Sequence, residues 1–276
     1  KLSGKDRNVV KTVRLRGQIS QGIVGATTMV PEDVLAAGSE AITKHLGVTK
    51  YEPPEIVCLN GKLLPLPPEL THYDIEGADR YTNITALMMD RPVLVTEKME
   101  GSNFSVLARA SGEVCVNMRN KTIIPVEEGE HLFWTLAKRE GVIEAARELA
   151  QKSGTCAAIY CEAVGPSIQG NHYKLKQATL FLFDALSNGH WLSADETTTI
   201  AEQYRLRMAP VISKGATLAS WLNGKSIKEA SDGTSAVANV PREGIVIKPM
   251  KEERIESFGR LIIKQRSPAY LAKTGN

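Results

Sequence analysis

Short apolar runs joined by tight turns limit the folds open to this chain. Around Val93 the sequence changes to three β-type runs, which read PVLVTEKME, SNFSVLARA and EVCVNMRNKTII. The connections between them are Gly or Ser-Gly turns of only a few residues. Such runs with such short connections are typical of antiparallel strands that pair with their neighbours in sequence. A domain built on antiparallel sheets is therefore predicted.

Later segments add helices and more strands to this pattern. HLFWTLAKREGVIEAARELAQK has helical spacing, with Gly141 as a weak point, and SADETTTIAEQYRLR opens with a capping-box spacing at Ser193 and Glu196. A second short helix is predicted over residues 218–230. Strand-like runs are TCAAIYCEAVG, ATLFLFDALSN, EGIVIKPM and GRLIIKQRSP. The fold class predicted is α+β, with antiparallel sheets and peripheral helices.

The first 70 residues have a different character. Residues 9–24, VVKTVRLRGQISQGIV, read as two short strands with a Gly turn. Two strands are not stable alone, so we expect residues 1–30 to be the C-terminal part of a small β module in which the chain starts. Residues 31–70 should hold a helix over 31–46 and a Pro-rich extended linker, YEPPEIVCLNGKLLPLPPEL. The main domain is then expected over 71–276.

Composition excludes several classes of protein. A net charge of +3 does not require nucleic-acid binding, although it permits a local basic groove. The four cysteines show no C-x-x-C spacing, which argues against a zinc ribbon and predicts reduced thiols in a cytoplasmic protein. No apolar run is long enough to span a membrane, and the first residues do not resemble a signal peptide.

Charged residues recur where apolar strands end. A charge beside a buried strand costs free energy unless it is paired or hydrogen-bonded, and six strands share this feature. If these ends converge, they line a cleft with several cations and at least two carboxylates. Such a cleft suits a polyphosphate with a divalent metal ion. The residues concerned are Glu97, Lys98, Arg119, Glu162, Asp184, Glu243, Lys248, Lys264 and Arg266.

Five motifs follow one another in order: TEKMEGSN, YCEAVGPSIQGN, FLFDAL, EGIVIKP and LIIKQRS. The first contains K-x-x-G at Lys98, a pattern that also starts at Lys1, Lys44 and Lys138, so its context decides its meaning. The ordered series resembles that of the covalent nucleotidyltransferase superfamily of ATP-dependent DNA and RNA ligases and mRNA capping enzymes. TEK-x-x-G-x-N and E-x-x-G-P-x-I-Q are closest to RNA ligases. RLRGQISQGIV, LGVTKYEPP and YDIEGADRY resemble RNA ligases with an N-terminal OB module and no C-terminal domain.

The resemblance implies an ATP-dependent RNA ligase that self-adenylylates on Lys98, passes AMP to a 5′-phosphate and seals RNA ends in RNA repair. It implies catalytic roles for Lys98, Glu243, Lys264 and Arg266, with Glu243 holding Mg²⁺ or Mn²⁺. Phe183 would stack on adenine, Glu97 would read its amino group, and Lys248 would face the phosphates. The implied ATP-binding residues are Arg80, Glu97, Lys98, Gly101, Asn103, Arg119, Glu162, Phe183, Lys248 and Lys264.

Two residues depart from the usual motifs: the first bears on the subfamily, and the second is expected to preserve function. Glu100 stands where capping enzymes and DNA ligases usually have Asp, and Arg266 replaces the second lysine of the usual K-x-K, keeping its charge. A DNA ligase, a capping guanylyltransferase and a catalytically dead nucleic-acid-binding ligase fold remain alternatives. The expected partner is RNA, as a nicked duplex or as RNA ends, with Arg14 and Arg16 as possible backbone contacts. We expect a monomer.

Overall fold

The computed structural model describes residues 13–15, 18–20, 26–47, 57–58, 61–70, 72–125 and 131–274. The chain divides into two units, Lys1–Pro54 and Glu55–Asn276. In the first, β1 pairs with β2 in antiparallel fashion, and α1 and α2 are separated by Gly38, whose φ of 91° lies outside the helical range. The elements of this unit are β1 (Val13–Leu15), β2 (Gln18–Ser20), the 3₁₀ helix η1 (Thr27–Met29), α1 (Glu32–Ala36) and α2 (Ser39–Leu46).

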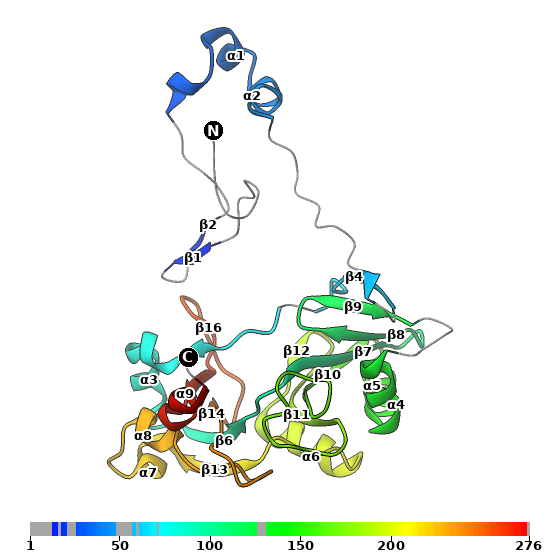
Figure 1. Cartoon of the computed structure of the whole chain (residues 1–276), viewed down its shortest axis with the longest axis vertical. Helices are drawn as coiled ribbons and strands as arrows, with labels where there is room; N and C mark the ends of the chain where they lie inside the picture. Colours follow the sequence, from blue (N-terminus) through cyan, green and yellow to red (C-terminus); the bar gives the residue numbers. More distant parts are fainter. Residues whose placement is uncertain are drawn as a thin grey trace. The chain divides into compact units, whose positions relative to one another are not determined.

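The second unit contains an eight-stranded sheet in the order β12-β11-β10-β7-β8-β9-β4-β3, in which every neighbouring pair is antiparallel (Figure 1). The predicted runs around Val93 form the middle of this sheet and part of the next. Its strands are β3 (Val57–Cys58), β4 (Gly61–Pro65), β7 (Ser102–Arg109), β8 (Val114–Met118), β9 (Lys121–Ile124), β10 (Cys156–Val164), β11 (Thr179–Ser187) and β12 (His190–Trp191).

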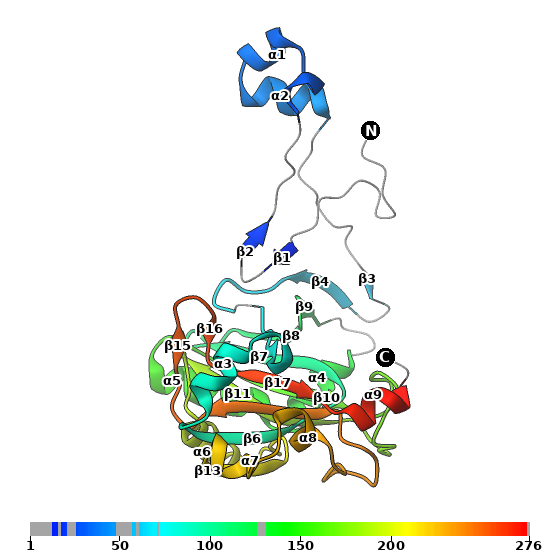
Figure 2. The same ribbon diagram turned by 90° about the vertical axis from the view of Figure 1, so that its left-hand side faces the viewer.

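A five-stranded sheet has the order β13-β6-β14-β17-β5, with only the β17–β5 pair parallel. In it β6 and β14 lie side by side, so residues 146 to 156 positions apart in the chain, from the pair Lys98–Gly244 to the pair Val93–Pro249, become neighbours (Figure 2). Its strands are β5 (Glu76–Gly77), β6 (Pro92–Lys98), β13 (Val211–Thr217), β14 (Gly244–Pro249) and β17 (Ile263–Arg266). A separate hairpin joins β15 (Arg254–Ile255) to β16 (Gly259–Arg260).

Helices cover the outer faces of the sheets. The largest hydrophobic core packs the eight-stranded sheet against α4, α5 and α6, and a second core packs the five-stranded sheet against α3, α7 and α8 (Figure 1). No described helix is both long and apolar enough to cross a membrane. The helical elements of this unit are η2 (Ala78–Arg80), α3 (Thr82–Met88), α4 (Leu132–Arg139), α5 (Val142–Ser153), α6 (Ala194–Gln203), α7 (Leu218–Leu222), α8 (Ile227–Ser231) and α9 (Pro268–Thr274).

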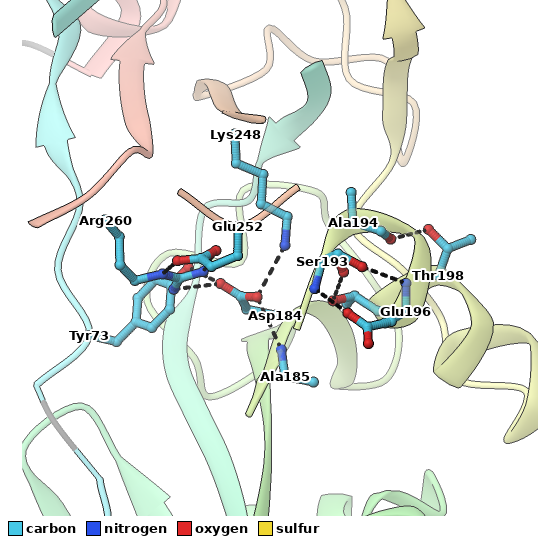
Figure 3. Close-up of polar contacts among 11 residues, drawn as sticks. Tyr73, Asp184, Ala185, Ser193, Ala194, Glu196, Thr198, Lys248, Glu252 and Arg260 are labelled. Carbon is cyan, nitrogen blue, oxygen red and sulfur yellow. Dashed lines mark hydrogen bonds and ion pairs between the residues drawn. The ribbon is translucent and has the colours of Figure 1, made fainter. Parts of the chain in front are cut away.

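Local sequence signals set several helix boundaries correctly. Gly141, with a φ of 73°, separates α4 from α5. The capping box that begins α6 is complete: Ser193 Oγ accepts from the Glu196 N–H at 3.2 Å, and Glu196 Oε2 accepts from the Ser193 N–H at 2.8 Å (Figure 3). These bonds satisfy N–H groups that the first helical turn leaves unpaired.

Three segments differ from the expectation. The Pro-rich stretch expected as a linker contains β4, which pairs with β9 because Leu63 packs against the largest core. The helix expected over 218–230 is two helices, since Asn223 and Gly224 adopt φ values of 46° and 81°. GRLIIKQRSP divides between β16 and β17, which belong to different sheets. Of the expected OB-like module, residues 13–15, 18–20 and 26–30 fall within the described residues, and they contain β1, β2 and η1.

Candidate active site

A cavity of about 360 Å³ is lined by both large sheets. Strands β6, β14 and β17 contribute from the five-stranded sheet, and β7, β8, β10 and β11 contribute from the eight-stranded sheet. The strand ends that the sequence predicted to converge therefore do so at one place. The predicted residues that line the cavity are Glu97, Lys98, Gly101, Asn103, Arg119, Glu162, Phe183, Lys248 and Lys264.

Lys98 ends β6 and lies beside the first residue of β14. Its Nζ donates a hydrogen bond to Glu243 Oε2 at 2.7 Å, and both side chains are largely buried. The strand register fixes this contact, because Lys98 pairs with Gly244, the neighbour of Glu243. A lysine with one face on a carboxylate and the other on a cavity can present its nitrogen to a ligand.

Gly101 and Gly244 are required by close backbone approach at this point. A Cβ on Gly101 would lie 2.2 Å from the carbonyl oxygen of Ala163 on β10, and a Cβ on Gly244 would lie 2.0 Å from that of Gln265 on β17. Any side chain at position 101 would push the β6–β7 turn away from β10. The glycine of K-x-x-G thus brings Lys98 of one sheet close to Glu162 of the other.

Glu162 lies on β10 opposite Asn103, next to the Lys98 amine. Burial raises the pKa of Glu162 to about 8; Lys98 opposes this shift, whereas Glu243 and Glu100 add to it. Its carboxyl group is therefore mostly protonated at pH 7 and can donate a hydrogen bond as well as accept one. A nearby cation would favour the ionised form instead.

Cations gather near Lys98. Lys264 lines the cavity, and its Nζ lies 3.5 Å from Asp74 Oδ1, an atom that Arg119 Nη2 also approaches at 3.2 Å. Arg266 Nε lies 3.9 Å from Glu243 Oε1 and is buried without a hydrogen-bond partner among the described residues. These groups can hold an anion beside the Lys98 amine. Arg80, by contrast, is exposed on η2 and does not line the cavity.

The cavity is also lined by Phe183 and Lys248, which lie at one end because Lys248 binds the neighbour of Phe183, and by Glu97, which adjoins Lys98 on β6. Glu97 Oε2 accepts from the Ala236 N–H at 3.0 Å, while its buried Oε1 has no hydrogen-bond partner in the described part of the chain. Lys248 pairs with Leu94, four residues along β6 from Lys98, which corresponds to about 13 Å at 3.3 Å per residue. Lys248 is thus offset from Lys98 by four residues along the sheet, and its expected contact with the phosphates stays a prediction.

Asp184, one of the expected cleft carboxylates, is fully buried next to Phe183 in the sequence and does not line the cavity. It binds Lys248 at 3.1 Å and Arg260 at 2.9 Å (Figure 3). Sequence reasoning missed Arg260, and it missed the lining residues Tyr73, Asp74, Thr96 and Gln169. All four missed lining residues lie in segments that the sequence had singled out: Tyr73 and Asp74 open YDIEGADRY, Thr96 opens TEKMEGSN, and Gln169 ends the E-x-x-G-P-x-I-Q motif.

The carboxylates near Lys98 fit a hydrated divalent cation. Glu100 Oε2 is buried without a hydrogen-bond partner among the described residues, and Glu100 and Glu243 both act on the charge of Glu162. The described residues include no group of three His, Cys, Asp or Glu side chains that could hold a metal ion by themselves. Mg²⁺ suits such a site, because it commonly keeps several waters and uses one or two protein carboxylates.

The chain is similar to proteins of known structure. Over 96% of its length it resembles a ligand-free aspartate-to-alanine mutant of Naegleria gruberi RNA ligase, with 29% identity, a TM-score of 0.66 and 76% of that chain covered. A glutamate-to-alanine mutant of the same ligase, solved with AMP and Mn, matches at 28% identity and a TM-score of 0.65, and the match covers 96% of this chain and 76% of that chain. A lysine-to-alanine mutant of the ligase solved with ATP and Mn matches at 28% identity and a TM-score of 0.66, and the match covers 96% of this chain and 75% of that chain.

Other comparisons address the family directly. No curated protein matches the chain. The family model described as RNA ligase matches residues 91–266. This span contains the first four ordered motifs, all but the last residue of the fifth, and the strands of both large sheets that line the cavity. Because this match covers more than half of the sequence and agrees with the fold, the chain belongs to the RNA ligase family.

Proposed function

We propose that the protein is an ATP-dependent RNA ligase that forms a covalent lysyl-AMP on Lys98. The observation that carries this proposal is the contact between Lys98 Nζ and Glu243 Oε2 beside a cavity that residues of all five ordered motifs line. The ATP-bound and AMP-bound states of the Naegleria gruberi RNA ligase support the choice of nucleotide. The enzyme then passes AMP to a 5′-phosphate and joins that end to an RNA 3′-OH, at nicks in RNA repair.

In the first step Lys98 Nζ attacks the α-phosphorus of ATP. The N–P bond forms as the bond to the bridging oxygen breaks, and pyrophosphate leaves. Glu243 Oε2, already hydrogen-bonded to Nζ, is placed to accept the proton that the amine must lose. Lys264 and Arg266 stabilise the charge that builds on the phosphate oxygens. A divalent cation, Mg²⁺ or Mn²⁺, would neutralise phosphate charge, held by Glu243 and, through waters, by Glu100.

The remaining cavity residues bind the nucleoside. Phe183 offers a partly buried ring for stacking on adenine, and the unpaired Glu97 Oε1 can accept from the adenine amino group. Lys248 lies at this same end and can donate to an acceptor nitrogen of the adenine ring. Glu162 and Asn103, opposite each other, would contact the ribose.

The polyphosphate and the RNA would extend beyond the cavity. Arg119 would contact the phosphates, and Arg80, which is exposed on η2, would reach the β- and γ-phosphates only where these project from the cavity. In the smaller unit Arg14 belongs to β1, whereas Arg16 lies outside the described residues. We propose that both contact the RNA backbone as part of an OB module, in a monomeric cytoplasmic enzyme.

The test is incubation with ATP labelled at the α-phosphate in Mg²⁺ or Mn²⁺, followed by denaturing electrophoresis. Wild-type protein should retain label, and Lys98→Ala should retain none while keeping the wild-type circular dichroism spectrum. Label on the mutant at another lysine would contradict the assignment. Labelling by GTP instead of ATP would favour a capping guanylyltransferase, and no labelling of the wild type would favour a dead ligase fold.

Sealing assays then distinguish an RNA ligase from a DNA ligase. Nicked duplexes that differ only in an RNA or a DNA 3′-OH terminus are compared on a gel. The RNA terminus should be sealed preferentially; equal sealing of both would favour a DNA ligase.

A further inference from the structure

The β15–β16 hairpin lies between the motifs EGIVIKP and LIIKQRS and carries an arginine that reaches the nucleobase end of the site. Arg260 Nη1 donates to Asp184 Oδ2 at 2.9 Å, although the two residues are 76 positions apart (Figure 3). Asp184 follows Phe183, the ring proposed to stack on adenine. The hairpin is thus connected to the cavity through one buried carboxylate.

Arg260 is held on both its edge and its face. Glu252 accepts from Arg260 Nε at 2.6 Å and from Nη2 at 2.8 Å, a two-pronged contact that fixes the plane of the guanidinium. The indole of Trp191 lies against the guanidinium face, with its ring centroid 3.9 Å from Cζ. An arginine restrained in this way presents Nη1 to Asp184 in one orientation.

The Asp184 carboxylate is saturated. Oδ1 accepts from Lys248 Nζ and from the Ala185 N–H, each at 3.1 Å, and Oδ2 accepts from Arg260 and from the Tyr73 hydroxyl at 2.8 Å. Burial opposes the charged form, but Lys248 and Arg260 outweigh it and hold the pKa of Asp184 below its usual range. Burial and the Asp184 charge raise the pKa of Tyr73 well above its usual value, so this hydroxyl remains a donor.

Because Arg260 and Tyr73 occupy Oδ2, Lys248 is confined to Oδ1. An ammonium group has three N–H donors, and Asp184 is the one described side chain that Lys248 contacts in an ion pair. Lys248 also lines the cavity, so its other donors can serve a ligand there. The charges of the cluster also balance, with Lys248 and Arg260 against Asp184 and Glu252. Lys248 therefore does not have to neutralise Asp184 alone.

We infer that Arg260 is a positioning residue that sets how well the site binds and selects its nucleobase, by keeping Lys248 turned toward the cavity. The inference rests on the proposed function, since it takes ATP as the ligand and places its base beside Phe183. Without Arg260, Asp184 would draw Lys248 across both of its oxygens, because a buried carboxylate recruits whatever cation is within reach. The base would lose a donor, whereas the phosphate end near Lys98 would keep its contacts.

The experiment measures single-turnover self-adenylylation of Arg260→Gln. We expect the apparent KM for ATP to rise about tenfold, with kcat within twofold of wild type, because one charge-assisted hydrogen bond is worth roughly a factor of ten. Inhibition by inorganic pyrophosphate, which lacks a base, should change by less than twofold. The preference for ATP over GTP should fall. A purely structural role would lower kcat for both nucleotides instead.

Two further variants make the result decisive. Arg254→Gln is the matched control, since Arg254 pairs with Arg260 across the hairpin but is exposed, and it should behave as wild type. Arg260→Lys keeps a cation beside Asp184 while losing the two-pronged contact with Glu252, so its KM should rise only about threefold. If Arg260→Gln fails to fold, as circular dichroism would reveal, Arg260→Lys is measured in its place.

The outcomes separate this inference from the proposed function. An unchanged KM in the folded variants would overturn the positioning role, and so would an equal weakening of ATP and pyrophosphate, which would put Lys248 at the phosphates. If the wild type forms no adenylate at all, the proposed function fails instead.

Discussion

Replacing Glu162 by Gln should stabilise the ligand-free protein at neutral and alkaline pH. In the folded protein, burial together with Glu243 and Glu100 raises the pKa of Glu162 to about 8, from an ordinary value of 4.5. Between these two values the folded state binds more protons than the unfolded state. The free energy of unfolding therefore falls as pH rises through this range, because the unfolded carboxyl ionises first.

The size of the effect follows from the two pKa values. At 1.36 kcal/mol per pKa unit, raising the pKa from 4.5 to about 8 costs the wild type at most about 5 kcal/mol above pH 8. Since Glu162 keeps some contact with solvent, we expect about 2–5 kcal/mol. Glutamine is nearly the same size and carries no charge, so the variant should lose this part of the pH dependence.

Urea unfolding between pH 5.5 and 8.5, followed by circular dichroism, measures the difference. Nucleotide is left out and a chelator is added, because a bound cation would favour the ionised carboxylate. Glu256→Gln, on an exposed residue of the β15–β16 turn, is the control and should follow the wild-type curve. Parallel pH curves for wild type and Glu162→Gln would refute the assignment of a raised pKa.

Four further outcomes are expected. Glu243→Ala should lose metal-dependent adenylylation but keep most of its ATP affinity; an unchanged metal titration would contradict this. Phe183→Ala should weaken ATP binding by roughly 1–3 kcal/mol, a larger loss than Phe183→Leu or Phe183→Tyr causes. Equal losses in all three variants, together with lower thermal stability, would mark Phe183 as a core residue. Gly101→Ala should destabilise the fold by about 1–3 kcal/mol in urea, because its Cβ meets a carbonyl oxygen at 2.2 Å; wild-type stability would show that the turn can shift. Replacing both Arg14 and Arg16 by Ala should reduce the slope of log K for RNA binding against log salt concentration by about 0.9 per lost phosphate contact, while self-adenylylation stays intact. An unchanged slope would argue that these arginines make contacts within the protein.

Local signals in the sequence determined the elements and their class. The runs around Val93 became β6 to β9, and Gly141 and Ser193 set helix boundaries because turn and capping preferences depend on residues a few positions apart. Most of the residues that line the cavity lie within the ordered motifs, among them Lys98 and Phe183. These motifs lie at strand ends, so a correct list of strands already placed them near one another.

Tertiary structure alone decided which charged residues in and around the cavity pair with one another. Asp184 joins Tyr73 and Arg260, which are 111 and 76 positions away. Tyr73 opens the segment YDIEGADRY, but no local pattern of the sequence indicates that either residue meets Asp184. The register of β14 on β6 sets Lys248 opposite Leu94, four residues from Lys98, an offset that the order of motifs does not contain. The raised pKa of Glu162 likewise arises from burial and from carboxylates on other strands. Buried electrostatics depends on which side chains the sheets bring within a few ångströms, and that is fixed only when the whole chain has packed.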